Sequence, residues 1–354
     1  MTTSLFIDQI KAVFAPFVSK ISEVDPEQEQ PLFKTLLTEE ESITGDFNET
    51  RVSGNIVASD IVALGSPLPL AERPSLGLVS GKIPKIGKKT RLDERQMKTI
   101  QYLVATGRDQ AEVRKNLLND TVRLIKGQDL RLEQMLYQAL STGIMQTGED
   151  ETEGIAVRIS FKRAENELQS TKGWDKADAT PITDLYALFD KVEGEQKAVG
   201  VLYMSKKALN QIRASKEGKA LVRDFLGLAG NTTLPSPSRK NMISALEDEF
   251  AVSVKMIDGK FKVSNSQGTT QTINGFSDEF VVAAPSGKLG RLVYTRLPEE
   301  DFPVAGVTYA KSGSYNLVSK FGSTDPVEEF TAIQAMVIPV LDNTDAIFRL
   351  KITD

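Results

Sequence analysis

The residues of this sequence that could do covalent or metal chemistry are a few serines, a serine–lysine neighbour pair and a run of carboxylates. Ser205 and Lys206 have the types needed for a serine nucleophile activated by an amine, and Ser312-Gly313-Ser314 resembles part of a catalytic loop. Hard oxygen ligands for a cation stand in one short run: Glu149, Asp150, Glu151 and Glu153. The serine loop lacks a histidine base, and a solvated acidic turn after a helix explains the carboxylates better.

Neither histidine nor cysteine occurs among the 354 residues. Their absence removes the commonest general base, the commonest metal ligand and any thiolate nucleophile. Glycine-rich phosphate-binding motifs are missing as well. We therefore predict that the chain is not an enzyme, and we assign it no catalytic, cofactor-binding or metal-binding residue. A net charge of −5 argues against extended nucleic-acid binding, and no apolar run is long enough to cross a bilayer.

The element that organises the chain is a proline-free stretch from Leu92 to Gly148. Gaps of three, four and seven residues between its apolar positions are typical of an amphipathic helix. Those positions are Ile100, Val104, Ala111, Leu118, Val122, Ile125, Leu132, Leu136 and Ala139. We expect a spine helix with bends at Gly107 and Gly127, against which the rest of the subunit packs.

The first 30 residues predict one helix with Phe6 and Phe14 on its apolar side. One interpretation is a surface helix on a flexible tail. The other is an arm that docks on a neighbouring subunit, because an apolar face needs a partner.

Residues 51–91 read as a separate unit of short strands and turns, broken by prolines and glycines. Its far end is basic and carries Lys82, Lys85, Lys88, Lys89 and Arg91. Three interpretations stay open: a solvated loop, an extended hairpin whose tip lays positive charge on an acidic neighbour, and a nucleic-acid patch. The last is the weakest, because no aromatic residue stands between the lysines for base stacking.

The middle of the chain alternates strands and helices. Strands are expected at residues 155–161, 199–204, 250–257, 280–284 and 292–294. Helices are expected to start at Pro181, after a Ser205 cap with Gly218 as a possible break, and after a Ser238 cap. The end is strand-rich, and Asp342-Asn343-Thr344 predicts a hairpin between residues 332–341 and 346–352.

The run from Arg131 to Gly143, RLEQMLYQALSTG, resembles a signature of the lambda-type (protein E-like) major capsid proteins of tailed phages. In that family an R-x-E stretch and a later A-L-x-x-G close the long helix. The order of later motifs is also similar: ATPITDL from Ala179, Tyr203-Met204-Ser205, and LDNTDA from Leu341. The likeness covers roughly residues 50–354 as a series of short motifs.

This resemblance implies an α+β tailed-phage major capsid fold. Its parts would be an N-terminal arm (1–50), an extended E-loop hairpin (51–91), a peripheral domain with the spine helix (92–165), an axial α/β domain (166–296) and a strand-rich return to the peripheral domain (297–354). The inter-subunit contact candidates are Lys82, Lys85, Lys88, Lys89, Arg91, Phe6 and Phe14.

The implied function is a major capsid protein that assembles itself into an icosahedral head shell around packaged double-stranded DNA. Implied partners are further copies in pentamers and hexamers, a separate scaffolding protein, a portal protein, an optional decoration protein, and DNA held on the inner surface without sequence specificity. No cofactor and no membrane are implied. The expected location is the virion head, after assembly in the host bacterial cytoplasm. The alternatives are an encapsulin-like compartment shell of the same fold and a helical adaptor protein.

Overall fold

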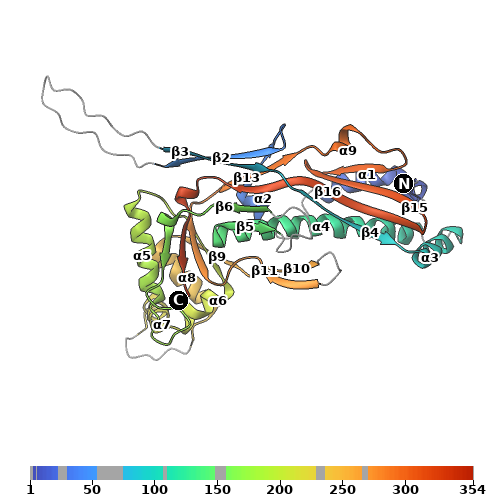
Figure 1. Cartoon of the computed structure of the whole chain (residues 1–354). Coiled ribbons are helices and arrows are strands. Elements are labelled where there is room, and N and C mark those ends of the chain that lie inside the picture. Colours follow the sequence, from blue (N-terminus) through green and yellow to red (C-terminus); the bar gives the residue numbers. More distant parts are fainter. Residues whose placement is uncertain are drawn as a thin grey trace, which may run out of the picture. The chain divides into compact units, whose positions relative to one another are not determined.

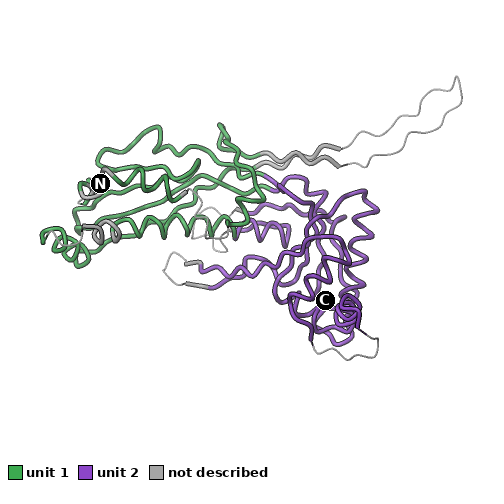
Figure 2. Tube along the Cα trace, turned by 180° about the vertical axis from the view of Figure 1, so that it is seen from behind, with its two compact units in different colours: residues 1–47, 80–133, 291–340 green, residues 48–79, 134–290, 341–354 purple. Residues whose placement is uncertain are grey.

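The computed structural model describes residues 3–4, 6–22, 30–53, 75–106, 110–147, 157–228, 236–264 and 270–353 (Figure 1). The chain forms two compact units (Figure 2). Unit 1 comprises Met1–Phe47, Ser80–Glu133 and Arg291–Val340, and unit 2 comprises Asn48–Val79, Gln134–Gly290 and Leu341–Asp354. Within the described ranges, no helix has both the length and the apolar composition that crossing a membrane requires.

Unit 1 is built on a six-stranded sheet in the order β1-β13-β16-β15-β14, with β4 paired to β16 off that path. Its strands are β1 (Leu37–Glu41), β4 (Lys85–Leu92), β13 (Gly290–Thr295), β14 (Thr308–Ser312), β15 (Asn316–Thr324) and β16 (Val327–Leu341). Every second residue of β16 from Glu329 to Val337 is buried, which is the period of a strand with one face on a core. β15 and β4 both run antiparallel to β16.

The helices of unit 1 include most of the predicted spine. They are α1 (Ile7–Ser22), α2 (Leu32–Leu36), α3 (Glu94–Ala105), α9 (Pro298–Asp301) and α4 (Gln110–Thr142), of which residues 134–142 belong to unit 2. The predicted single spine is therefore two helices, and Gly107 lies outside the described residues. α4 continues through Gly127. The start of α3 follows a capping box, in which the Asp93 carboxylate accepts from the Gln96 N–H at 2.8 Å.

The core of unit 1 confirms the helix stripe expected from the sequence. Leu118 and Ile125 of α4 are 6% and 4% exposed and pack in one apolar cluster with Val318 and Ile333 of the sheet. Phe14 of α1 belongs to the same cluster. The period of the apolar residues thus identified the buried face of α4 correctly.

Unit 2 contains a five-stranded sheet in the order β7-β17-β12-β8-β9. Its strands are β7 (Glu167–Gln169), β8 (Val201–Ser205), β9 (Ser253–Ile257), β12 (Phe280–Ala284) and β17 (Phe348–Lys351). β12 runs antiparallel to β8 and β17, whereas β8 with β9 and β17 with β7 are parallel pairs. In this register Arg349, Val282 and Tyr203 lie opposite one another and share one face of the sheet.

Among the described residues, four helices lie wholly within unit 2: α5 (Pro181–Gly194), α6 (Lys206–Ala214), α7 (Lys216–Phe225) and α8 (Arg239–Phe250). The predicted start at Pro181 and the Ser205 and Ser238 caps are confirmed; each serine hydroxyl accepts from the N–H three residues on. The break falls at Ser215, which ends α6 and caps α7. Gly218 lies inside α7, where a Cβ would sit 2.0 Å from the Ile212 carbonyl oxygen, so this glycine permits close packing rather than a break.

Three two-stranded sheets complete the described strands: β2 (Asp46–Ser53) with β3 (Ser75–Lys82), β5 (Ile144–Thr147) with β6 (Val157–Ser160), and β10 (Lys260–Ser264) with β11 (Thr270–Asn274). The strand predicted at 155–161 is found as β6, and its first two residues lie outside the described ranges. Short 3₁₀ turns occur at Ala164–Asn166 and Thr344–Ala346.

The predicted C-terminal hairpin is wrong. β16 pairs within the sheet of unit 1, whereas β17 pairs with β12 and β7 in the sheet of unit 2. Asn343 adopts a left-handed conformation with φ of 51°, and a 3₁₀ turn follows it. The turn residues were recognised correctly, but a turn does not decide which strands pair across it.

The single tryptophan lies in unit 2 and is 3% exposed. The Trp174 indole N–H donates to the Asp184 carboxylate at 2.8 Å, and the Thr171 backbone N–H and hydroxyl donate to the same group. The buried carboxylate at the start of α5 is thus satisfied by three donors, which ties the tryptophan loop to that helix.

Candidate functional site

The basic residues of the predicted hairpin lie on strands rather than at a tip. Lys82 ends β3, whereas Lys85, Lys88, Lys89 and Arg91 all lie on β4. All five side chains are exposed. β4 pairs residue by residue with β16, from Lys85 opposite Met336 to Leu92 opposite Glu329. The expectation that they crowd the tip of an extended hairpin is therefore wrong, because eight residues of β4 form a ladder with the unit 1 sheet.

Some of these cations have partners within the chain. The Lys85 Nζ lies 2.7 Å from the Glu299 Oε1, and the Arg91 Nη1 lies 3.0 Å from the Glu328 Oε1. The Lys89 ammonium lies over the Phe330 ring, 5.0 Å from its centroid. Burial alone would raise the pKa of Glu299, but the hydrogen bond and charge of Lys85 hold that pKa below its ordinary value. These contacts orient the basic side chains along β4 without removing them from solvent.

The two phenylalanine candidates lie at the N-terminus. Phe14 is 1% exposed because α1 packs it into the core of unit 1, and Phe6 is half-buried against the same cluster. The apolar face of α1 therefore has a partner within its own chain. A contact of Phe6, Phe14 or the basic residues with another subunit stays a prediction.

A buried ionic cluster lies beneath α1. Lys320 of β15 and Glu329 of β16 are each 1% exposed. The Lys320 ammonium donates to the Leu117 carbonyl at 3.1 Å and to the Thr331 hydroxyl at 2.8 Å. Glu329 accepts from the Ser4 hydroxyl at 2.7 Å, and its other oxygen accepts from a backbone N–H of the same N-terminal segment at 3.2 Å. Burial lowers the pKa of Lys320, and the carboxylates of Glu329 and Asp120 oppose that shift.

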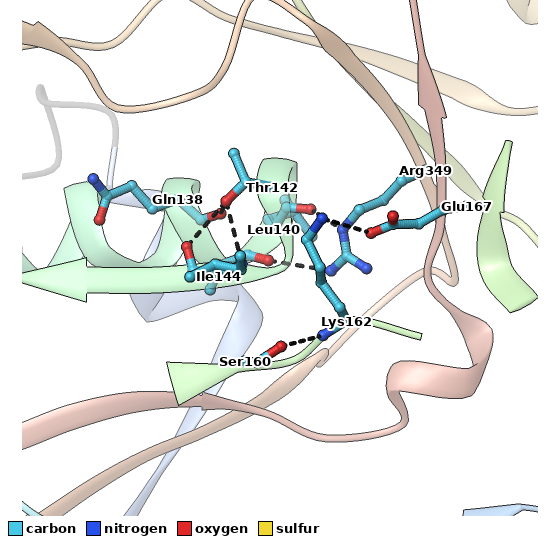
Figure 3. A network of polar contacts seen from close by, with 9 residues as sticks. Gln138, Leu140, Thr142, Ile144, Ser160, Lys162, Glu167 and Arg349 are labelled. Atoms are coloured by element: carbon cyan, nitrogen blue, oxygen red, sulfur yellow. Dashed lines mark hydrogen bonds and ion pairs between the residues drawn. The ribbon is translucent and has the colours of Figure 1, made fainter. Parts of the chain in front are cut away.

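A second buried cation lies in unit 2, where Arg349 is fully buried at the end of α4 (Figure 3). Its Nε donates to the Leu140 carbonyl at 3.0 Å, and its Nη2 donates to the Ala139 carbonyl at 3.1 Å. Carbonyls in the last turn of a helix have no partner within the helix and carry its negative end. Burial lowers the pKa of Arg349 to about 10, and Glu167 opposes the shift. The arginine therefore acts as a buried cap on α4.

Sequence reasoning did not identify Lys320 or Arg349. The one available signal was a basic residue inside an otherwise apolar strand, as in Leu317-Val318-Ser319-Lys320-Phe321. Such a residue is usually assigned to the solvent face, but residues 316–320 of β15 are all buried, so neither face of the strand is open to solvent there.

The residues considered for covalent chemistry have structural roles. The Ser205 hydroxyl caps α6, and Lys206 lies 3.2 Å from Asp258 rather than serving as a base. Ser312 is 1% exposed, and the Ser314 hydroxyl donates to Glu39 at 2.6 Å. The four clustered carboxylates at 149–153 lie outside the described residues. Within the residues that the structure describes, no three acidic side chains gather in a way that could hold a metal ion.

Comparison with known proteins matches residues 19–352 to the family of phage major capsid protein E. The chain belongs to this family. The fold agrees with a prophage protein of Escherichia coli CFT073 named for a proposed capsid role, at 14% identity and a TM-score of 0.56 over 100% of both chains. It also agrees with the capsid of cyanophage A-1(L), at 11% identity and a TM-score of 0.51 over 94% of this chain and 95% of that one. No curated protein sequence matches the chain.

The protein is thus a phage major capsid protein with the α+β capsid fold, a structural component of the virion head shell that assembles with itself. It is not an enzyme, because its family and fold are those of capsid proteins. The encapsulin-like alternative fits less well, since the family match is to a phage capsid protein.

The motif that carried the resemblance has a physical explanation in this capsid protein. Leu132, Leu136 and Leu140 are fully buried along α4, and Gly143 follows the helix with φ of 69°. A Cβ at Gly143 would lie 3.0 Å from the Arg349 guanidinium carbon and 2.8 Å from a side-chain carbon of Lys162. Glycine is therefore required twice, for the left-handed end of the helix and for the approach of the arginine.

Proposed function

We propose that this capsid protein forms pentamers and hexamers that close into an icosahedral head around packaged double-stranded DNA. Assembly would take place in the host bacterial cytoplasm on a separate scaffolding protein, with a portal protein at one vertex and a decoration protein as an optional addition. DNA would lie against the inner surface without sequence specificity, consistent with a net charge of −5.

Within this proposal the parts of the chain have separate roles. Residues 1–50 serve as the N-terminal arm and 51–91 as the extended E-loop, except that its last strand, β4, joins the unit 1 sheet. Residues 92–165 and 297–354 make the peripheral domain, and 166–296 make the axial domain.

The observation that carries the proposal is the exposed set of basic side chains along β4. Lys88 and Lys89 stand in the middle of a strand whose basic residues are all exposed. Like charges brought together this densely favour contact with an acidic surface, and charged contacts set the register between subunits more than they set the affinity. We therefore assign β4 and Lys82 to the contact between neighbouring copies.

The experiment is charge reversal followed by negative-stain electron microscopy. The unaltered chain, expressed with its scaffolding protein, should give closed shells or rings of five and six. A Lys82→Glu, Lys88→Glu, Lys89→Glu variant should remain a folded monomer, because these substitutions spare the Lys85–Glu299 pair. The matched control reverses three exposed lysines of unit 2: Lys207, Lys240 and Lys255. Normal shells from the β4 variant would remove β4 from the interface, and an unaltered chain that never assembles would contradict the proposed function itself.

A further inference from the structure

Three strands of the unit 1 sheet lie at its edges in the described residues, β1, β4 and β14, and two of them, β1 and β4, are strongly charged. In the part of the chain that the structure describes, β1 pairs with β13 and β4 pairs with β16, each on one side. The outward side of an edge strand presents backbone N–H and carbonyl groups that can pair with another chain. Native proteins commonly place charged side chains on such strands to prevent unwanted pairing, and an oppositely charged edge is the one partner that such charges do not repel.

The two edges carry opposite charges. β1 bears three consecutive exposed glutamates, Glu39, Glu40 and Glu41, and the exposed side chains of β4 include four cations. Two β1 edges brought together would repel, and so would two β4 edges, because like charges directly across a strand pair are destabilising. A β1 edge against a β4 edge is attractive. The charge pattern therefore excludes both symmetric pairings and permits only the mixed one.

Contacts inside the chain leave part of this charge uncompensated. Glu40 is paired with Arg291 at 2.9 Å, as Lys85 is with Glu299. In contrast, Glu39 accepts from the uncharged Ser314 hydroxyl, and Lys89 lies over an uncharged aromatic ring. Neither contact neutralises the ion, so each edge can still attract an opposite charge.

An apolar side chain adjoins the acidic edge. Ile43 follows β1 in the turn to β2 and is 98% exposed. Full exposure of a large aliphatic side chain is unfavourable in water, and a partner that covers it gains the corresponding burial. The acidic edge therefore offers a partner two kinds of contact: the charges of its glutamates, which can orient the partner, and the apolar side chain of Ile43, which the partner can bury.

We infer that the β1 edge of one copy binds the β4 edge of a second copy of this chain. This inference rests on the proposed function, and it names the acidic surface that the basic strand meets. Because each copy carries both edges, every copy offers one contact in each direction. Such a head-to-tail interface generates closed rings when the rotation between copies closes, as a capsid requires.

The test uses two half-reversed variants and their combination. Variant A carries Lys88→Glu and Lys89→Glu, and variant B carries Glu39→Lys and Glu41→Lys. Lys85, Arg91 and Glu40 are paired within the chain, so the substituted residues set the charge that each edge offers to a partner. That charge is acidic on both edges of variant A and basic on both edges of variant B, so each variant alone should assemble at least about ten-fold less well than the unaltered chain. The chain that carries all four substitutions has restored complementarity and should form shells again, as judged by sedimentation velocity and electron microscopy.

A one-to-one mixture of the two variants gives a sharper result. Every A–B contact joins opposite edges, whereas A–A and B–B contacts repel. Strict alternation closes only rings with an even number of copies, so the mixture should give six-membered rings and lack five-membered ones.

The matched control reverses Lys207, Lys240, Asp190 and Glu193, which are exposed in unit 2, and it should assemble normally. Thermal melting establishes that A and B are folded. If the unaltered chain assembles while the four-substitution chain does not, the β1–β4 contact is wrong and the proposed function stands. If variant B assembles normally, the acidic edge is not the partner.

Discussion

Unit 1 and unit 2 each bury a cation that donates hydrogen bonds to the backbone of α4, but the two cations contact different parts of the helix. Lys320 reaches the Leu117 carbonyl within the helix, and its other contacts are with the sheet and the ring of Phe14, 5.8 Å from the ammonium. Arg349 reaches the Leu140 and Ala139 carbonyls in the last turn. A carbonyl within a helix already has a partner, whereas those of the last turn do not.

The two side chains differ in how firmly each holds its proton and in how many carbonyls each can reach. Arginine keeps its proton and has a planar fork that spans two carbonyls, so Arg349 is suited to a fixed cap. Lysine is a single ammonium whose pKa shifts readily on burial, and Lys320 lies beside Glu329, which holds the N-terminal segment. Unit 2 thus secures the end of α4, whereas in unit 1 Lys320 links α4 to the sheet and Glu329 links the sheet to the N-terminal segment.

The largest effect should come from removing the cap. We expect Arg349→Ala to cost about 3–5 kcal/mol, because two buried carbonyls lose their donor and a cavity remains. Arg349→Lys keeps the charge but cannot span both carbonyls, so its cost should be smaller. Guanidinium denaturation followed by circular dichroism measures both. A cost below about 1 kcal/mol for the alanine variant would mean that the last turn does not need the arginine.

A smaller loss of stability should come from substituting Gly143, whose missing side chain leaves room for the Arg349 guanidinium. Gly143→Ala places a Cβ in a left-handed position and against the guanidinium, at an expected cost of about 1–3 kcal/mol. Gly127→Ala is the matched control on the same helix. A Cβ added at position 127 would meet no atom within 4 Å apart from the adjacent residues and backbone of its own helix, so alanine should stabilise α4 by up to about 1 kcal/mol. Equal melting temperatures for the two variants would remove the requirement for glycine at 143.

The smallest effect concerns the pH dependence of Lys320. Its pKa in the folded chain lies below the ordinary value of 10.5, so between those two pKa values the folded chain binds fewer protons than the unfolded chain. Stability contributed at this site should therefore rise with pH in that window. We expect the difference in unfolding free energy between the unaltered chain and Lys320→Met to shift in favour of the unaltered chain from pH 7.5 to 10. A difference that stays constant or falls would contradict the sign.

Local chemistry made parts of the fold predictable from the sequence. Pro181, Ser205 and Ser238 start helices because a fixed φ or a capping hydroxyl acts on the next few residues. The stripe of α4 was equally readable, because helix periodicity does not depend on distant partners.

Partners far apart in the chain account for what could not be predicted. The burial of Lys320 and Arg349 depends on carbonyl oxygens 203 and 209 residues away that accept their hydrogen bonds. β4 pairs with β16, which lies more than 230 residues later in the chain. The spacing of the lysines does not indicate that pairing. The basic residues were therefore recognised in the sequence, but they were assigned to a hairpin tip instead of to a strand of the unit 1 sheet.

The location of Trp174 supplies an optical label. As the one indole of the chain, buried in unit 2 beside the Asp184 carboxylate, it makes tryptophan emission a signal from unit 2. Loosening of that unit would let water reach the ring and move its emission to longer wavelengths. Rearrangement confined to unit 1 would leave the spectrum largely unchanged, so one fluorescence trace recorded during shell formation can separate events in the two units without any added dye.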